Sequence, residues 1–257
     1  MSNSVHRALR VLNELAEAPK TAEQLATSLG VHRTTALRIL QVLESEGFVA
    51  RNDQHVYRLG ARVLSLGQQA LEGIDLRDAA SDAMRHLNEV TGHTIHLAVL
   101  EGAHVVYVDK REAADSVRMQ SRIGQVAAIH CTAVGKAIVA NLPPVQQTKV
   151  IAALDFEAKT DRTLSDVDSF RRELERTRER GYAVDDRENE QFVNCIGVPI
   201  IGAGGVVHGA MSISVTTVIR DLDALLDFVP DLIAVGSEVS RALGWEPSTQ
   251  EDEPARR

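Results

Sequence analysis

The sequence predicts an α+β protein made of two domains, and three observations support this fold class. Residues 21–60 contain two short helical patterns that are separated by a glycine and followed by two extended runs. Residues 94–100 and 206–215 alternate apolar with polar or small side chains, as half-buried strands do. Helical patterns precede, separate and follow these strands, which indicates an antiparallel sheet with helices beside it.

The first domain is expected to begin with a helix over residues 4–17, where apolar side chains recur at helical steps. A second helix should follow Thr21, because Gln24 lies three residues later, which is the spacing of a capping box. Gly30 is typical of the residue that ends such a helix. A third helix is expected over residues 32–46 and would be the second helix of a helix-turn-helix.

The outward face of this third helix carries hydroxyl and guanidinium groups but no acid. An α-helix fits the major groove of DNA, where Arg can pair with guanine and Thr can contact a polar base edge or the thymine methyl. Its base-reading candidates are Arg33, Thr34, Thr35 and Arg38.

Two extended runs, residues 48–51 and 56–59, then predict a hairpin with a four-residue tip. Arg51 and Arg58 flank this tip as candidate phosphate contacts. The pattern as a whole predicts a winged helix-turn-helix that binds double-stranded DNA. The alternative is a small helical packing unit with a solvated polar face.

The charge distribution agrees with DNA binding by the first domain. The whole chain has a net charge of −8. Residues 1–62, which we assign to the DNA-binding domain, hold eight Lys or Arg and six Asp or Glu, whereas residues 63–257 hold 20 and 30. The small basic excess predicts several phosphate contacts and an affinity that falls with added salt.

An apolar helix over residues 63–74 should link the two domains. We interpret it as a dimerisation helix; the alternative is packing onto the second domain of the same chain. The second domain is assigned to residues 75–245, and residues 246–257, which contain proline and charge, to a disordered tail. The expected helices of the second domain are 75–90, 132–141, 143–153, 165–180 and 222–243, and its expected strands are 94–100, 104–110, 116–120, 195–201 and 206–215.

Three features of the second domain predict a ligand site. Ser212 and Ser214 share one face of a strand, with their hydroxyls about 7 Å apart, unless they merely line a solvent-exposed sheet. Residues 130–137 form a polar cap followed by small residues, and the free N–H groups of such a helix N-terminus attract an anion. Asp185, on a strand that enters a charged loop, could accept hydrogen bonds from ligand hydroxyls.

Catalysis and metal binding receive little support from the sequence. His130, Cys131 and Cys195 could form a nucleophile with its base or a metal site, but no accompanying motif is present. We therefore expect no enzyme activity, no metal and no cofactor, and two cysteines that are reduced thiols. The N-terminus lacks the apolar core of a signal peptide and no run of 18 apolar residues occurs, so we expect a cytoplasmic protein without membrane contact.

Four groups of residues together resemble the IclR family of bacterial transcriptional regulators. They are residues 34–40 with 47–49, 130–137, 181–190 and 195–200. The resemblance runs from about Ser4 to Trp245. It implies an N-terminal winged helix, a linker helix and a C-terminal effector domain related to GAF and PAS folds, in homodimers or dimers of dimers.

The resemblance also implies an effector pocket for a small 2-oxo acid or another metabolite. Ala133 stands where the family can have a glycine, which puts the shape of the pocket floor in doubt. Residues 94–97 and 118–124 look most like the branch that senses 2-keto-3-deoxygluconate. The positions that match the pocket are Ala133, Val134, Asp185, Cys195, Ser212 and Ser214.

These observations predict a transcriptional repressor that reads a pseudo-palindromic operator as a dimer and responds to a small carboxylate effector. An activator with the same architecture is one alternative, because nothing in the sequence determines the sign of regulation. The other is a ligand-binding or enzymatic domain whose N-terminal unit contacts protein rather than DNA.

Overall fold

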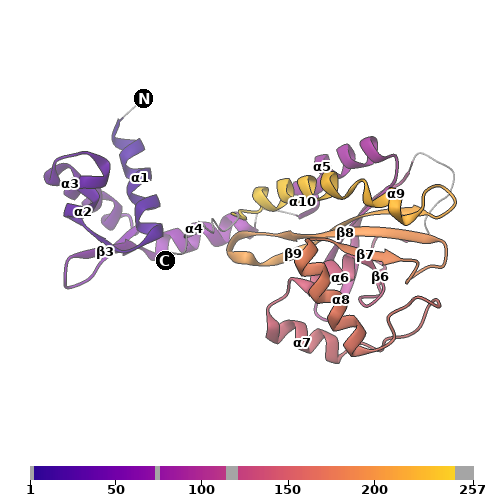
Figure 1. Ribbon diagram of the computed structural model, residues 1–257. Helices are drawn as coiled ribbons and strands as arrows, with labels where there is room; N and C mark the ends of the chain where they lie inside the picture. Colours follow the sequence, from indigo (N-terminus) through magenta and orange to yellow (C-terminus); the bar gives the residue numbers. More distant parts are fainter. Residues whose placement is uncertain (1–2, 73–75, 114–120, 247–257) are drawn as a thin grey trace, which may run out of the picture. The chain divides into compact units, whose positions relative to one another are not determined.

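The computed structural model describes residues 3–72, 76–113 and 121–246 and divides into two compact units, Met1–Ile74 and Asp75–Arg257 (Figure 1). The strand expected over residues 116–120 falls outside the described residues, as does the tail expected over residues 246–257 apart from residue 246.

The first unit is a three-helix bundle with a small antiparallel sheet, as expected for a winged helix-turn-helix. The sheet has the strand order β1-β3-β2. In the core of the first unit, Val11 and Leu15 of the first helix pack with Leu25, Leu40 and Tyr57. The elements are α1 (Asn3–Glu17), β1 (Lys20–Thr21), α2 (Ala22–Leu29), α3 (Arg33–Ser45), β2 (Val49–Arg51), β3 (Val56–Leu59) and α4 (Ala61–Glu72).

The predicted signals around α2 are confirmed. The Thr21 side chain accepts a hydrogen bond from the Gln24 N–H, and the Gln24 side chain accepts one from the Thr21 N–H. Gly30 ends the helix in the left-handed conformation, with φ of 63°, which costs glycine little. The turn between α2 and α3 is therefore specified by local sequence.

The second unit is built on one antiparallel sheet of six strands in the order β6-β5-β4-β9-β8-β7. The strands β6 (Val126–Ala127) and β1 were not predicted, since each has only two residues. The other strands are β4 (Thr94–Glu101), β5 (His104–Arg111), β7 (Ala183–Asp186), β8 (Val193–Ile201) and β9 (Val207–Thr216). The helices are α5 (Leu76–Thr91), α6 (Ala133–Ala140), α7 (Pro144–Ala152), α8 (Val167–Arg180), α9 (Leu222–Leu226) and α10 (Val229–Ala242).

Helices cover both faces of this sheet (Figure 1). Met211 and Ile213 of β9 pack with α5 and α10 in one core. Ala210 of the same strand packs in a second core with α6 and α8. The alternation predicted for β9 is thus confirmed, and it directs Ser212 and Ser214 toward the α6 side.

The single closing helix predicted over residues 222–243 is wrong in one respect, because it is two helices. α9 ends at Leu226, and α10 begins at Val229 with Pro230 in its first turn. Proline lacks an N–H to donate to the carbonyl of Leu226, and its ring would clash with that carbonyl. A continuous helix through Pro230 is therefore disfavoured.

Candidate functional site

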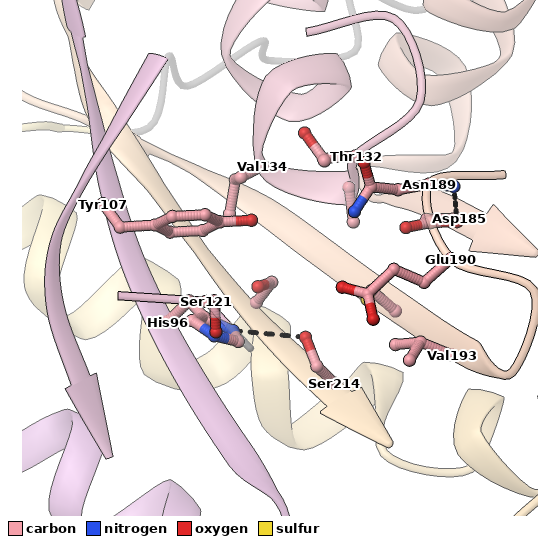
Figure 2. Close-up of a pocket in the computed structure, with 13 residues that line it drawn as sticks. His96, Tyr107, Ser121, Thr132, Val134, Asp185, Asn189, Glu190, Val193 and Ser214 are labelled. Carbon is pink, nitrogen blue, oxygen red and sulfur yellow. Dashed lines mark hydrogen bonds between the residues drawn. The ribbon is translucent and has the colours of Figure 1, made fainter. Parts of the chain in front are cut away.

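All six predicted pocket residues line one cavity of the second unit (Figure 2). The cavity lies between the N-terminus of α6, the strands β4, β5, β8 and β9, and the loop that follows β7. Its volume is about 20 Å³, which is room for one or two water molecules. The six residues are Ala133, Val134, Asp185, Cys195, Ser212 and Ser214.

Sheet register brings the polar members together. Asp185 of β7 lies opposite Cys195 of β8, which lies opposite Ser214 of β9, so the three form one row across the sheet. Ser212 lies opposite His96 of β4 in the adjoining row. Ser212 and Ser214 are only 3% and 4% exposed, which excludes the alternative that they line a solvent-exposed sheet.

The N-terminus of α6 supplies unpaired donors to this cavity. The Thr132 side chain caps the helix by accepting a hydrogen bond of 3.2 Å from the Gly135 N–H. Among the described residues, the N–H groups of Ala133 and Val134 have no hydrogen-bond acceptor. Free N–H groups and the helix dipole together favour an anion at this position.

The Asp185 carboxyl is buried, with 1% of the residue exposed. Its Oδ1 accepts hydrogen bonds from the N–H groups of Glu188, at 2.7 Å, and Asn189, at 3.3 Å. In Figure 2 its other oxygen is directed toward the cavity. Burial raises the pKa of Asp185 to about 7, although nearby Lys136 acts in the opposite direction. Close to neutral pH this carboxyl can therefore either donate or accept a hydrogen bond.

Further cavity-lining groups were not among the predicted site residues, chiefly His96, Tyr107, Ser121, Asn189 and Glu190. Alternation along the predicted strand of residues 94–100 could have indicated the face of His96. Ser121, Asn189 and Glu190 lie in segments that carry the family resemblance, but no periodicity in the sequence indicates that they face the cavity.

His96 is a neutral hydrogen-bonding group. Its Nδ1 lies 3.2 Å from the Ser214 Oγ and its Nε2 lies 2.7 Å from the Ser121 Oγ (Figure 2). Burial, with a smaller contribution from Lys110, lowers the pKa of His96 to about 3. A neutral imidazole has one donor and one acceptor, so it holds the two hydroxyls without adding charge to the cavity.

The two cysteines are poorly suited to catalysis. Burial raises the pKa of Cys131 to about 12 and that of Cys195 well above its usual range. Both are then protonated near neutral pH, whereas nucleophilic attack and metal binding require the thiolate. His130 contacts the carbonyl of Glu157 at 3.0 Å. Within the described ranges, no cluster of His, Cys, Asp and Glu could hold a metal ion.

The exposed face of α3 is the second candidate site, in the first unit. Arg33, Thr34 and Arg38 are exposed, whereas Thr35 is half-buried and lines a groove with α1 residues. The Arg33 Nε lies 2.8 Å from the Glu23 Oε1. An arginine guanidinium has two further nitrogens, which can donate hydrogen bonds to a base edge.

The wing places Arg51 and Arg58 on opposite faces. Arg51 of β2 pairs with Tyr57 of β3, and Arg58 pairs with Ala50. Residues directly opposite each other in an antiparallel pair share a face, and neighbours along a strand do not. Arg51 lines a hollow with Arg33, but Arg58 does not. The structure therefore does not bring the two predicted phosphate contacts to one face.

The Asp185→Asn variant should gain stability relative to the natural protein as pH rises, because the natural protein loses stability over that range. An unfolded Asp loses its proton near pH 4, whereas the pKa of Asp185 in the fold is about 7. Stability from this group is therefore fully present below pH 4 and is lost as pH rises through 7. This difference between the folded and unfolded pKa values corresponds to about 4 kcal/mol of unfolding free energy.

Urea unfolding at pH 5 and pH 8 measures this effect. The chain has one tryptophan, Trp245, whose fluorescence reports on the second unit. Asp53→Asn, at the exposed wing tip, is the matched control and should keep the pH dependence of the natural protein. The same pH dependence in Asp185→Asn would show that Asp185 does not titrate in this range.

Comparisons with known proteins identify the family of this chain. The family model described as bacterial transcriptional regulator IclR C-terminal matches residues 68–241, and an N-terminal domain model named HVO_A0261 matches residues 1–79. The regulator XynR of Escherichia coli is 33% identical over 94% of this chain and 97% of its own length. KdgR of the same species is 29% identical over 95% of this chain and 93% of its own length.

A solved structure is similar in fold. The crystal structure of Thermotoga maritima IclR has a TM-score of 0.64 and 31% sequence identity, and the match covers 95% of this chain and 99% of that one. In the part of the chain that the structure describes, no helix has the length and apolar character needed to cross a membrane. This chain belongs to the IclR family of bacterial transcriptional regulators, with a DNA-binding helix-turn-helix and an effector-binding domain.

Proposed function

We propose that the protein is a repressor whose dimer leaves its operator when a small carboxylate occupies the cavity at the N-terminus of α6. The observation that carries the proposal is the convergence of two free N–H groups, at Ala133 and Val134, with the hydroxyl of Ser212 and the carboxyl of Asp185. The N–H groups suit a carboxylate, and the other groups suit the keto and hydroxyl oxygens of a 2-oxo or sugar acid such as 2-keto-3-deoxygluconate.

The same proposal assigns DNA binding to α3 and no chemistry to the cavity. Thr34 and Arg38 would read bases, with Arg33 at the edge of that face, and Arg51 would contact phosphate. A neutral His96 and two protonated thiols leave no activated nucleophile in the cavity. Leu64 of α4 is 81% exposed and would be covered by a second copy of the chain in a dimer.

Fluorescence anisotropy tests the proposal directly. Because the operator is unknown, the full chain is first used to select bound sequences from a random DNA library. The selected duplex is then titrated with 2-keto-3-deoxygluconate, pyruvate and glyoxylate, and separately with salt. Specific binding that is weakened by one of these acids supports the proposal, and light scattering tests the dimer.

The other outcomes distinguish the alternatives. Strengthened DNA binding would favour an activator. If none of the acids changes DNA binding, the protein is still a DNA-binding regulator, but its ligand is not of this class. No specific binding to any selected sequence would favour an N-terminal unit that contacts protein, and such an apolar contact should not weaken with added salt.

Ser212→Ala should weaken binding of the effective acid about fivefold to tenfold and leave operator affinity unchanged. The Ser212 hydroxyl makes no hydrogen bond with a described residue, so its loss removes a ligand contact without breaking an internal one. A single neutral hydrogen bond contributes about 1 kcal/mol. Isothermal titration calorimetry measures the change, with Ser237→Ala of α10 as the control. Unchanged acid affinity in Ser212→Ala would remove this serine from the site.

A further inference from the structure

Lys136 is a fully buried cation directly behind the cavity. It lies in α6, three residues after Ala133, and has 0% exposure. Its Nζ lies 2.7 Å from the Glu188 Oε1, 52 residues further along the chain. It does not line the cavity. Burying two opposite charges costs several kcal/mol of desolvation for each ion, so this pair is poorly explained by stability alone.

Glu188 connects that cation to the cavity wall. Its N–H donates to the Asp185 Oδ1 at 2.7 Å, and its carbonyl accepts from the Thr163 hydroxyl at 2.6 Å. The two residues that follow it, Asn189 and Glu190, line the cavity (Figure 2). The ion pair thus joins α6, whose N-terminus forms one wall, to the loop that forms another.

We propose that the Lys136–Glu188 ion pair is a positioning device that sets the charge carried by Asp185 and thereby the pH range in which the cavity accepts an anion. The proposal rests on the proposed function only for its second part, the identity of the occupant. The charge of Asp185 can be measured with no ligand present.

The two members of the pair act on Asp185 in opposite directions. The positive charge of Lys136 lowers the pKa of Asp185, and the negative charge of Glu188 raises it. Burial raises the pKa of Asp185 more than either charge changes it, and the result is a pKa of about 7. Near neutral pH, a small change in the ion pair therefore alters the fraction of Asp185 that is ionised. A carboxyl that gains a proton stops repelling an incoming carboxylate.

Other titratable groups around Asp185 lie on or next to five elements of the second unit. Tyr107, Cys131 and Cys195 have raised pKa values and stay protonated near neutral pH, and His96 has a lowered pKa and stays neutral. The exposed Glu190 is the further carboxylate at the cavity. By element these groups are His96 on β4, Tyr107 on β5, Cys131 before α6, Glu190 after β7 and Cys195 on β8.

Two single variants of the full chain make the test. Lys136→Met removes the charge that lowers the pKa of Asp185, and Glu188→Gln removes the one that raises it while keeping an oxygen for Lys136. NMR titration of protein labelled with carbon-13 at the aspartate carboxyl measures the Asp185 midpoint, and the signal is assigned from its loss in Asp185→Asn. We expect the midpoint to move up by about one pH unit in Lys136→Met and down by about one in Glu188→Gln.

Pyruvate affinity, measured by calorimetry between pH 5.5 and 8.5, should follow the same midpoints. Opposite shifts of the NMR midpoint support the proposal, because a damaged fold would not produce opposite signs. Shifts in one direction, or none, overturn it. If the midpoints move as expected but none of the three acids binds, the ion pair still controls the charge of Asp185, and only the proposed ligand class is wrong.

Two further variants keep the test sound. Lys136→Met leaves a buried carboxylate unpaired and can unfold the protein. The double variant Lys136→Met with Glu188→Leu replaces the pair by apolar groups, and its midpoint should lie between those of the single variants. Glu14→Gln breaks the Lys20–Glu14 ion pair of the first unit and should leave the Asp185 midpoint unchanged.

Discussion

Gly135→Ala is expected to destabilise the second unit by about 2–3 kcal/mol and to abolish anion binding at the N-terminus of α6. A Cβ at position 135 would lie 2.5 Å from the Ile129 carbonyl oxygen and 2.6 Å from the Ile129 Cα. Both are backbone atoms, so the segment that leads into the Thr132 cap has to move. That movement displaces the free N–H groups of Ala133 and Val134. Urea unfolding followed by Trp245 fluorescence measures the loss of stability.

Gly102→Ala is the matched control for this substitution. Gly102 lies in the hairpin between β4 and β5, with φ of 62° and no atom within 4 Å of an added Cβ. Gly102→Ala should lower the unfolding free energy only by the cost of a left-handed alanine, about 1–2 kcal/mol. The variant should keep its response to the effective acid. If Gly135→Ala were as stable as the natural protein, the close approach of α6 to Ile129 would be refuted.

Arg33→Ala combined with Arg38→Ala should reduce the preference for the selected operator over random DNA by about two orders of magnitude or more. Each good bidentate pairing of Arg with guanine contributes about 1–3 kcal/mol of discrimination. Both guanidinium groups are exposed on α3 and neither packs in the core of the first unit, so the fold should persist. Competition anisotropy against random duplex, at several salt concentrations, gives the preference directly.

The control removes the same charge elsewhere. Arg85 and Arg176 are 62% and 61% exposed in the second unit. Their double replacement by Ala should preserve operator preference, because it lowers the net charge equally without altering α3. If the Arg33→Ala, Arg38→Ala variant keeps its operator preference, other residues read the bases. If the variant keeps that preference and only the salt dependence of its DNA affinity is reduced, Arg33 and Arg38 contact phosphates.

Local patterns predicted most of the elements and the orientation of β9. Thr21, Gln24 and Gly30 specify α2 through contacts within a few residues, and strand alternation alone places Ser212 and Ser214 on one face. The grouping of Asp185, Cys195 and Ser214 depends on the register of three strands. Register is a long-range property, so that group was assigned through family resemblance rather than from periodicity.

The wing shows how register limits such prediction. A symmetric four-residue tip would pair Arg51 with Val56 and put Arg51 and Arg58 on one face. The observed pairing of Arg51 with Tyr57 is shifted by one residue, which reverses the face of Arg58. His55, at the end of the tip, has φ of 59°. The sequence around it does not predict this left-handed conformation, which is uncommon for residues other than glycine.

The burial of Lys136 was also beyond the sequence pattern. Lysine usually extends its ammonium group to water even when its stem is covered. Here α6 is buried on all sides, and the partner carboxylate, Glu188, lies 52 residues away in a loop. A cation within a run of small and apolar residues was the available signal, but its partner could be found only in the fold.

Under the proposed function, the small volume of the cavity would limit how fast its ligand binds. A 2-oxo acid is larger than the space between the closed side chains, so it can enter only those molecules whose walls have separated. Its association rate is the diffusional rate multiplied by the open fraction, and its apparent affinity falls by the same fraction. Closure behind the ligand then slows its departure. In the proposed function, such a cavity would therefore respond slowly to a change in the concentration of its ligand.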